Sequence, residues 1–326
     1  MTDLTGLGWD DDWERALAQQ GDGALRPARV VAVHRGRVAV RDAAGESLLP
    51  VLAPEPALVG DWAGVRDGAV RALLPRRTLL ARDGAGQVAN ADLCVAVTSL
   101  NQDLNLRRAE RFLALARAGG IDALVVLSKG DLARDPAGEA ARVQQRLACE
   151  VIALSAQDGW GVAALRARLH PRTTTVLVGT SGAGKSTLVN LLLGEERQRT
   201  LEVRAGDDRG RHATTHRELF VLKDGALLVD TPGVRAPGMA STDGLDETFA
   251  DIARLARSCR FADCRHDDEP GCAVRAAIEA GELDSDRLRS LRKLEREGLS
   301  AQERREQARD FHRRYRREIR ARSRPR

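Results

Sequence analysis

A glycine-rich run between an apolar segment and a helix-forming segment carries the strongest chemical signal in the sequence. Residues 179–187 (GTSGAGKST) match G-x-x-x-x-G-K-[ST], with TTTVLV before them and LVNLLL after them. The glycines allow backbone N–H groups to curl around phosphate oxygens, and the start of a helix adds its dipole. The sequence therefore predicts a phosphate site. The residues that we expect to bind the phosphates are Gly179, Ser181, Gly182, Ala183, Gly184, Lys185, Ser186 and Thr187.

Three side chains and one backbone group are expected to complete a nucleotide–magnesium site. Lys185 would act catalytically by neutralising the β- and γ-phosphates, and the Ser186 hydroxyl would ligate Mg²⁺. Asp230 begins the run DTPG after the apolar segment ALLV. Its carboxylate at the end of a strand would hold Mg²⁺ through water, and the N–H of Gly233 would meet the γ-phosphate.

A polar loop lies between these two motifs and ends in GRHATTH, residues 210–216. A threonine hydroxyl in such a loop can reach Mg²⁺ only when a γ-phosphate is present, which is how many nucleotide switches work. We expect Thr215 to be this magnesium ligand, with Thr214 as the alternative. An ordinary polar surface loop is the other interpretation.

A second motif predicts that the base is guanine. The run SKGD at the end of the apolar segment ALVVL resembles the guanine-specificity motif N-K-x-D. Asp131 would accept from the ring N–H and the exocyclic amine of guanine, a donor pair that adenine lacks. The stem of Lys129 would cover the base, and Ser128 replaces the usual Asn. Ser155 and Ala156 end the next apolar segment and resemble the S-A-x loop that backs the base.

The order of these motifs is inverted. The base motif precedes the phosphate loop in this chain, whereas ordinary GTPases place the phosphate loop first. A parallel sheet tolerates such a circular permutation, because the nucleotide binds at the carboxyl ends of the strands whatever their order along the chain. The segment after DTPG then leads directly into the C-terminal region, so its movement would be passed to that region.

A cluster of metal-ligating residues follows. Cys259, Cys264, His266 and Cys272 offer three thiolates and one imidazole in the spacing C-x₄-C-x-H-x₅-C. Four such ligands close a tetrahedral zinc site and leave no open position for catalysis. Zinc would take the place of the core that this short polar segment lacks.

The elements that must position these residues fall into three predicted domains after a flexible or short helical lead-in over residues 1–23. Short alternating segments predict a small β-barrel over residues 24–80, and residues 76–90 read as a linker. Strands that alternate with helices over residues 88–240 predict a parallel sheet in an α/β P-loop GTPase domain. Residues 241–326 predict a mainly helical zinc-binding domain with a basic tail. The predicted fold class is therefore multidomain.

Charge is distributed unevenly although the net charge is only +5. Residues 286–326 carry sixteen Lys and Arg against seven Asp and Glu. Such a tail suits RNA, although a solvated helix in an arginine-rich protein explains it equally well. The sequence shows neither an apolar run of bilayer length nor a signal peptide, and the clustered cysteines suit a reducing compartment. A cytoplasmic location is expected.

Six segments together resemble the ribosome small-subunit-dependent GTPase A family (RsgA), which consists of circularly permuted assembly GTPases. They are ANADLCVAVTSLNQDLNLRRAERFLALA, LSKGDL, LVGTSGAGKSTLVNLLL, GRHATTHREL, LVDTPGV and CRFADCRHDDEPGC. The resemblance covers residues 26–299 and implies an OB-like barrel, a permuted GTPase domain and a zinc domain. It further implies late maturation of the small (30S) ribosomal subunit, whose rRNA the GTP form would bind and whose contact would stimulate hydrolysis of GTP to GDP. His212 would then orient the attacking water, and the protein would work as a monomer away from membranes.

Three positions depart from these patterns. Ser128 stands at the Asn position, Ala213 replaces the first Thr of GRHTTT, and Val234 follows DTPG where many GTPases carry a water-orienting Gln. Slow intrinsic hydrolysis is therefore expected. Two other interpretations stay open: a non-catalytic RNA-binding zinc protein that holds guanine nucleotide for structure, and an adenine-nucleotide enzyme.

Overall fold

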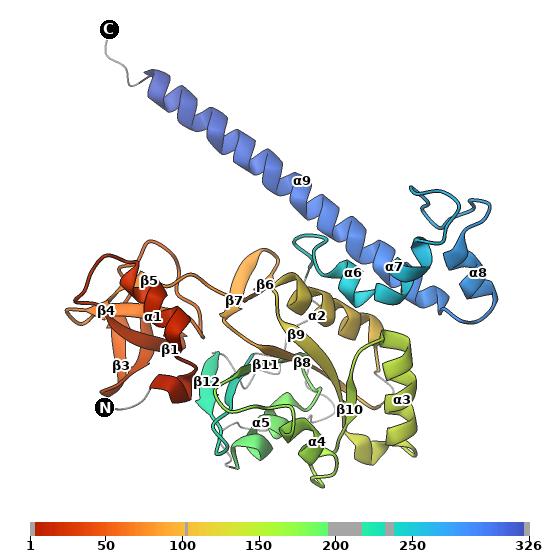
Figure 1. The fold of residues 1–326 in the computed structure, drawn as a ribbon, viewed down its shortest axis with the longest axis horizontal. Coiled ribbons are helices and arrows are strands. Elements are labelled where there is room, and N and C mark those ends of the chain that lie inside the picture. Colours follow the sequence, from red (N-terminus) through yellow and green to blue (C-terminus); the bar gives the residue numbers. More distant parts are fainter. Residues whose placement is uncertain (1–3, 102–103, 195–216, 232–237, 323–326) are drawn as a thin grey trace, which may run out of the picture.

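The chain forms a barrel, a central sheet covered by helices, and a helical C-terminal region that ends in one long helix (Figure 1). The computed structural model describes residues 4–101, 104–194, 217–231 and 238–322. Side chains of the last helix are described as far as residue 303. No helix within these ranges is both long enough and apolar enough to cross a bilayer.

Five antiparallel strands close the N-terminal barrel, as the alternating segments predict. β1 pairs with β2 and β4, β2 pairs with β3, and β4 pairs with β5. A bridge from Val51, just after β3, to Val70 on β5 closes the ring. Small apolar side chains such as Val30, Val40 and Val65 fill the interior. The strands are β1 (Arg26–His34), β2 (Arg37–Asp42), β3 (Gly45–Pro50), β4 (Trp62–Arg66) and β5 (Ala69–Leu73).

Residues 4–18 form the short helical lead-in of the two alternatives, and not the flexible one. They form η1 (Leu4–Leu7) and α1 (Asp11–Ala18), and the latter begins with Asp10 as its N-cap. Trp13 is buried and lies 6.3 Å from the ring of Trp62 on β4. Asp10 also accepts two hydrogen bonds from Arg77, at 2.7 and 2.6 Å. The apolar tryptophan and this ion pair hold an otherwise acidic segment on the barrel.

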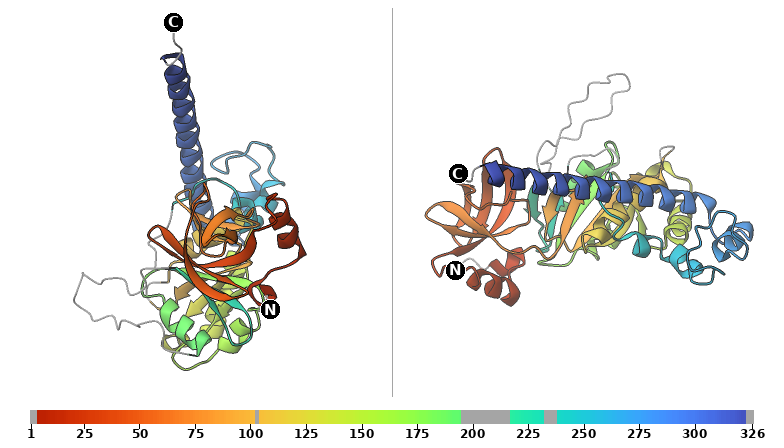
Figure 2. Two further views of the ribbon diagram at one scale, coloured as in Figure 1. Left: turned by 90° about the vertical axis from the view of Figure 1, so that its left-hand side faces the viewer. Right: turned by 90° about the horizontal axis from the view of Figure 1, so that it is seen from above.

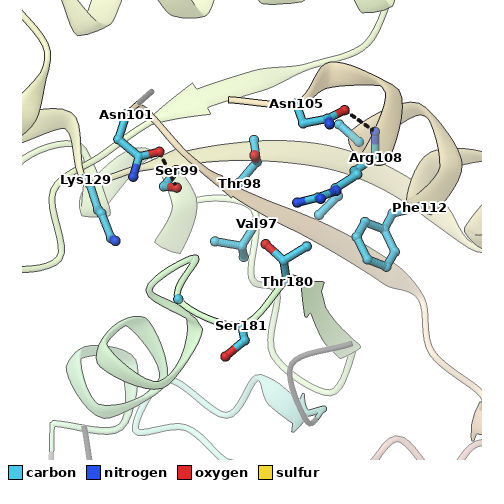
Figure 3. Close-up of a pocket in the computed structure, with 13 residues that line it drawn as sticks. Val97, Thr98, Ser99, Asn101, Asn105, Arg108, Phe112, Lys129, Thr180 and Ser181 are labelled. Carbon is cyan, nitrogen blue, oxygen red and sulfur yellow. Dashed lines mark hydrogen bonds between the residues drawn. The ribbon is translucent and has the colours of Figure 1, made fainter. Parts of the chain in front are cut away.

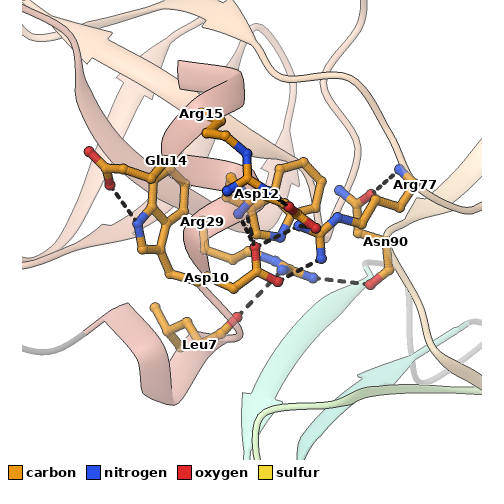
Figure 4. Close-up of polar contacts among 10 residues, drawn as sticks. Leu7, Asp10, Asp12, Glu14, Arg15, Arg29, Arg77 and Asn90 are labelled. Carbon is orange, nitrogen blue, oxygen red and sulfur yellow. Dashed lines mark hydrogen bonds and ion pairs between the residues drawn. The ribbon is translucent and has the colours of Figure 1, made fainter. Parts of the chain in front are cut away.

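A buried arginine joins the lead-in, the barrel and the central sheet (Figure 4). Arg29 on β1 donates to the carbonyl oxygens of Leu7 and Asn90 and to the hydroxyl of Thr174, at 3.1 to 3.4 Å. Burial lowers the pKa of its guanidinium to about 10, so it stays charged at neutral pH. Next to it, Ala32 of β1 pairs with Glu218 of the central sheet. The barrel is therefore fixed to the sheet along one strand edge.

The segment predicted as a linker, residues 76–90, instead contains a hairpin of β6 (Leu79–Arg82) and β7 (Ala85–Ala89). Its turn is Asp83-Gly84, and both residues have positive φ, at 49° and 81°. Asp-Gly is the sequence signal for such a two-residue turn, and it marks the hairpin in the sequence. Leu79 donates to the carbonyl of Gly119, so the hairpin packs on the end of the helix that precedes Gly119.

The central sheet has the alternation of strands and helices that the sequence predicts. Its strand order is β10-β9-β8-β11-β13-β12, with all neighbours parallel except β12, which runs antiparallel. The strands are β8 (Leu93–Ser99), β9 (Asp122–Ser128), β10 (Val151–Ala153), β11 (Thr174–Gly179), β12 (Glu218–Val221) and β13 (Leu227–Asp230). The helices are α2 (Leu106–Ala118), α3 (Pro136–Leu147), α4 (Val162–Arg166) and α5 (Lys185–Leu193).

Helices cover both faces of this sheet. Alternate side chains of β9 point to opposite faces, so Val125 and Leu127 join the core under α2 and α3, whereas Leu124 and Val126 join the core under α4 and α5. Nearly continuous apolar strands are what a sheet buried on both faces requires. Such a sheet presents the carboxyl ends of its parallel strands as a binding edge.

The C-terminal region is helical, as predicted. It contains α6 (Leu245–Thr248), α7 (Ala250–Ala256), α8 (Ala273–Glu279) and α9 (Ser285–Arg322). The basic tail lies in α9, a helix of 38 residues whose outer part projects away from the body of the molecule (Figures 1 and 2).

One arginine anchors α9 to the body. Arg287 is 1% exposed and donates to Asp251, at 2.6 and 2.8 Å, and to Glu110 of α2, at 3.2 Å. It also donates to the carbonyl of Thr248 at 2.8 Å and lies over the ring of Phe249. Glu110 is fully buried, so its charge depends on this partner.

We expect Arg287→Ala to destabilise the protein by about 3–5 kcal/mol, because it leaves the Glu110 carboxylate buried without its cation. The control is Arg289→Ala, which removes an exposed ion pair with Asp286 and should cost less than about 1 kcal/mol. Urea unfolding followed by circular dichroism measures both. Equal urea midpoints for the two variants would contradict the assignment of Arg287 as the anchor.

Candidate nucleotide site and metal centre

The phosphate loop runs from the end of β11 to the start of α5, as the motif requires. A Cβ at Gly179 would lie 2.4 Å from the carbonyl oxygen of Val97 on β8, so only glycine fits. Gly182 and Gly184 have φ of 79° and 81°, a region that glycine adopts without strain. The loop can therefore turn tightly at the carboxyl edge of the sheet, where Ser186 and Thr187 follow in the first turn of α5.

Lys185 and Asp230 are buried groups of opposite charge at this edge, and no direct ion pair joins them. Lys185 Nζ donates to the carbonyl oxygens of Gly179 and Thr180, both at 2.9 Å. Burial lowers the pKa of Lys185 to about 8, with the nearby charge of Asp230 opposing the shift. Burial likewise raises the pKa of Asp230 to about 6, against the effect of Lys185.

The carboxylate of Asp230 is buried without a hydrogen-bond partner in the described part of the chain. The residue is 1% exposed, and neither carboxylate oxygen has a hydrogen-bond partner among the described residues. Buried unpartnered acceptors are costly, and they are found where a cation or its water shell binds. The next residue, Thr231, is fixed by donating its hydroxyl to Leu177 O at 2.6 Å. Asp230 therefore fits the magnesium role that the sequence predicts for it.

A hydrogen bond joins the base motif to the phosphate loop. The Ser128 hydroxyl donates to the carbonyl oxygen of Ala183 at 2.7 Å. The contact arises because β9 ends beside β8, with Ser128 opposite Ser99, and β8 in turn lies beside β11. The structure therefore brings the two motifs together despite their inverted order, and the serine at the Asn position makes the link.

The other residues predicted to bind the guanine base lie on two adjacent turns. Lys129 adopts a left-handed conformation with φ of 58°, and Asp131 is exposed in the short helix η2 (Gly130–Leu132). Gly130 donates to the carbonyl of Leu154 at 2.9 Å, which ties this turn to the S-A segment. There Ser155 is buried and Ala156 is half-buried. The side chain of Asp131 is thus free to meet a base at the edge of the sheet.

Three of the predicted residues lie outside the described part of the chain. They are His212, Thr215 and Gly233; the alternative ligand Thr214 lies there too. Their predicted roles are carried by the sequence alone.

The four predicted zinc ligands meet in space. Their ligand atoms all lie within 4.8 Å of one another. Cys259 Sγ is 3.9 Å from Cys272 Sγ and 3.6 Å from His266 Nδ1. A tetrahedral zinc ion with Zn–S bonds of about 2.3 Å separates its sulfur ligands by roughly 3.8 Å. The cluster with Cys264 therefore fits such an ion in both donor chemistry and spacing.

A cavity beside the phosphate loop was missed in the sequence. It has a volume of about 560 Å³ and lies between the end of β8, the start of α2 and the phosphate loop (Figure 3). The residues that line it include Thr98, Ser99, Asn101, Asn105, Arg108, Phe112, Lys129, Thr180 and Ser181. The helical spacing of Asn105, Arg108 and Phe112 was the available signal, because it places them on one face of α2.

Comparison with known proteins agrees with this geometry. Residues 73–240 match the RsgA GTPase family. The small ribosomal subunit biogenesis GTPase RsgA of Opitutus terrae is 43% identical, with 90% of this chain and 89% of that protein covered. The protein of the same name from Streptomyces coelicolor is 44% identical, with 90% and 86% covered. The crystal structure of YjeQ from Thermotoga maritima is similar with a TM-score of 0.63 at 25% identity, covering 84% of this chain and 99% of that one. YloQ, described as a circularly permuted GTPase, shares the fold with a TM-score of 0.61 at 22% identity, over 86% and 96% of the two chains.

We expect Asp230→Asn to stabilise the nucleotide-free protein at pH 7 by about 1–3 kcal/mol while weakening Mg²⁺-dependent GTP binding. The pKa of Asp230 is raised on folding, so the folded state binds the proton more tightly than the unfolded state. Its contribution to the free energy of unfolding therefore falls as the pH rises from about 4 to about 6, and is lowest above that window.

Urea unfolding of the wild type and of Asp230→Asn at pH 4, 5, 6 and 7 measures this difference. The control, Asp224→Asn, changes a half-exposed carboxylate in the turn before β13 and should leave the pH dependence as in the wild type. A stability loss at pH 7 with Asp230→Asn would show that the carboxylate has a protein partner and is not poised for a cation.

We expect the purified protein to contain one zinc ion per chain, measured by elemental analysis. Cys272→Ser should lose the metal and lower the melting temperature, because zinc affinity adds to the stability of this segment. Cys149→Ala, a cysteine outside the cluster, should keep the metal. Zinc bound equally well by Cys272→Ser would contradict the site.

Proposed function

We propose, from the premise that this chain belongs to the RsgA GTPase family, that it hydrolyses GTP and acts in the late maturation of the small ribosomal subunit. The observation that carries the guanine nucleotide site is the hydrogen bond from Ser128 to Ala183. It holds the base motif beside the phosphate loop, so that the base and the phosphates of one nucleotide could bind at the same edge of the sheet. The relatives, which align with about nine-tenths of the chain, are themselves named as small ribosomal subunit biogenesis GTPases.

Different residues at the carboxyl edge of the sheet would bind the base and the phosphates of the nucleotide. Asp131 would pair with the ring N–H and amine of guanine, and Lys129 would cover the base. Gly179, Ser181, Gly182, Ala183 and Gly184 would present backbone groups to the phosphates, and Lys185 would leave its loop carbonyls to bind phosphate oxygens.

Magnesium would be held at the same edge, where it supplies positive charge to the β- and γ-phosphates when bound. The unpartnered carboxylate of Asp230 supports this assignment, as does the position of Ser186 in the first turn of α5. We assign Thr215 as the further ligand from the sequence. The N–H of Gly233 would meet the γ-phosphate.

For the hydrolytic step, His212 would orient the attacking water, as the family resemblance implies. Val234 follows the DTPG motif and cannot perform this task, because its side chain has no polar atom. Intrinsic turnover would therefore be slow and would rise when the small subunit positions His212.

The partner in this proposal is the rRNA of the small subunit. The OB-like barrel (24–80), the GTPase domain (88–240) and the zinc domain with its basic helix (241–326) would form one surface in the GTP state, and hydrolysis would release it. The arginine-rich α9 and the fixed joint at Arg29 support a rigid, basic docking body. We place this activity in the cytoplasm and assign it to a monomer.

A non-catalytic role for the nucleotide is the weaker alternative. Its support in the sequence is the missing glutamine at Val234 and the serine at position 128, but that serine makes the link between the two motifs. An unpartnered buried carboxylate beside a buried lysine is also a costly arrangement for a purely structural site.

We expect GTP turnover by the protein to rise at least about 100-fold when small ribosomal subunits are added, and to stay unchanged with large subunits. The measurement is phosphate release under single-turnover conditions, with Lys185→Ala as the inactive control. Excess unlabelled GTP should compete with the labelled GTP, and ATP should not. GTP that stays intact on small subunits would favour the non-catalytic alternative, and effective competition by ATP would favour an adenine-nucleotide enzyme.

A further inference from the structure

Helix α2 has two faces with different tasks. Arg107, Glu110 and Arg111 contact α9, through Asp286, Arg287 and Glu297 respectively. The other face carries Asn105, Arg108, Ala109 and Phe112, and these residues line the cavity beside the phosphate loop. The contacts on the first face fix the rotation of the helix about its axis and therefore direct the second face at the cavity.

Arg108 differs from the two arginines around it. Arg107 pairs with Asp286 at 3.1 Å, and Arg111 donates to Glu297 at 2.8 Å. The guanidinium of Arg108 has no hydrogen-bond or ion-pair partner within the described ranges, although the residue's own backbone N–H is capped by Asn105. A guanidinium whose five N–H donors have no bonded acceptor is available to an incoming anion.

The cavity suits an anion. Of the described residues that line it, two are cationic and none is acidic. Figure 3 shows the guanidinium of Arg108 projecting from α2 toward Thr98 and Thr180. The opposite wall is formed by Thr180, Ser181 and Gly182, the first turn of the phosphate loop. An anion that binds this loop therefore lies across the cavity from Arg108.

We propose that Arg108 is a further catalytic residue, which contacts the terminal phosphoryl group of GTP and stabilises the charge that develops there during hydrolysis. This inference rests on the proposed function. In the step, a water oxygen forms a bond to the γ-phosphorus and the bond to the β–γ bridging oxygen breaks. That oxygen keeps the electron pair, and the proton of the water leaves with the phosphate or to solvent. The guanidinium would contact the equatorial oxygens, where negative charge is spread in the transition state.

Arg108 would approach the terminal phosphate from a direction that no residue of the phosphate loop occupies. Lys185 approaches the phosphates from the α5 side, whereas Arg108 comes from α2 across the cavity. The chain has a valine after DTPG, so no glutamine at that position assists the transferred group. Because α2 is tied to α9 on its other face, a partner that moves α9 would also move Arg108 relative to the phosphates.

Three variants test the proposal: Arg108→Ala, Arg108→Lys and the matched control Arg107→Ala, which removes the neighbouring arginine from the α9 face. Each is measured with intact protein for single-turnover GTP hydrolysis on small subunits, and for the Kd of GTP and of GDP. We expect Arg108→Ala to slow hydrolysis by about 100-fold and to raise the Kd of GTP by about 10-fold, with the Kd of GDP unchanged. Arg108→Lys should recover part of the rate, because it keeps the charge without the planar fork. Arg107→Ala should hydrolyse GTP at the wild-type rate, because its exposed pair with Asp286 contributes little and the more buried contacts of Glu110 and Arg111 still hold α2 on α9.

Two outcomes would overturn the proposal. Arg108→Ala with the wild-type rate and the wild-type ratio of GTP to GDP affinity would show that the guanidinium does not contact the γ-phosphate. An equal loss of GTP and GDP affinity would show that the residue only supports the fold, and circular dichroism identifies an unfolded variant. If the wild type itself does not hydrolyse GTP, the proposed function fails. The ratio of GTP affinity to GDP affinity in Arg108→Ala then still shows whether Arg108 contacts the γ-phosphate.

Discussion

The register of three parallel strands is the constraint on which the nucleotide site depends. β9, β8 and β11 are adjacent and parallel, so the turns that follow them open at one edge. Residues 128 and 183, which lie 55 positions apart and in inverted order, meet there in a hydrogen bond of 2.7 Å. The close approach of β11 to β8 at Gly179 leaves no room for a side chain. Because a parallel sheet defines the site by position in space, the chain order of its motifs can be permuted without moving them.

The same sheet connects the site to the rest of the molecule through two rigid joints. At one edge, β12 pairs with β1 of the barrel, and Arg29 links the barrel to Thr174 on β11. On one face, α2 lines the cavity at its first turns and holds α9 through Arg287. The end of the chain is thus coupled to the nucleotide edge by packed helices, in addition to the covalent path through the segment after DTPG. Such coupling needs contacts that hold both ends of an element, and α2 has them.

Much of this organisation follows from the sequence, because its signals are local. The apolar runs predict the strands of the central sheet, the glycine pattern predicts the phosphate loop, and the cysteine spacing predicts the cluster at Cys259. The Asp83-Gly84 hairpin was predicted as a linker, although its turn residues are a recognisable signal. What the sequence hides is pairing at long range. Nothing near Arg287 indicates that Glu110 is its partner, and nothing near Arg108 shows that it faces the cavity while Arg107 and Arg111 face α9. Likewise, the lead-in is acidic by composition and is held on the barrel by a distant arginine, Arg77.

The central claim is that the carboxylate of Asp131 and the glycine-rich loop at residues 179–187 form a single guanine nucleotide site. Isothermal titration of GTP into the wild type and into the double variant Lys185→Ala/Asp131→Ala tests it most directly. The control, Lys223→Ala/Asp224→Ala, replaces the same two residue types in the turn at the opposite end of β13. The account predicts that GTP affinity falls at least about 1000-fold in the first variant and is unchanged in the second. Equal GTP affinity in the wild type and in the Lys185→Ala/Asp131→Ala variant would contradict it.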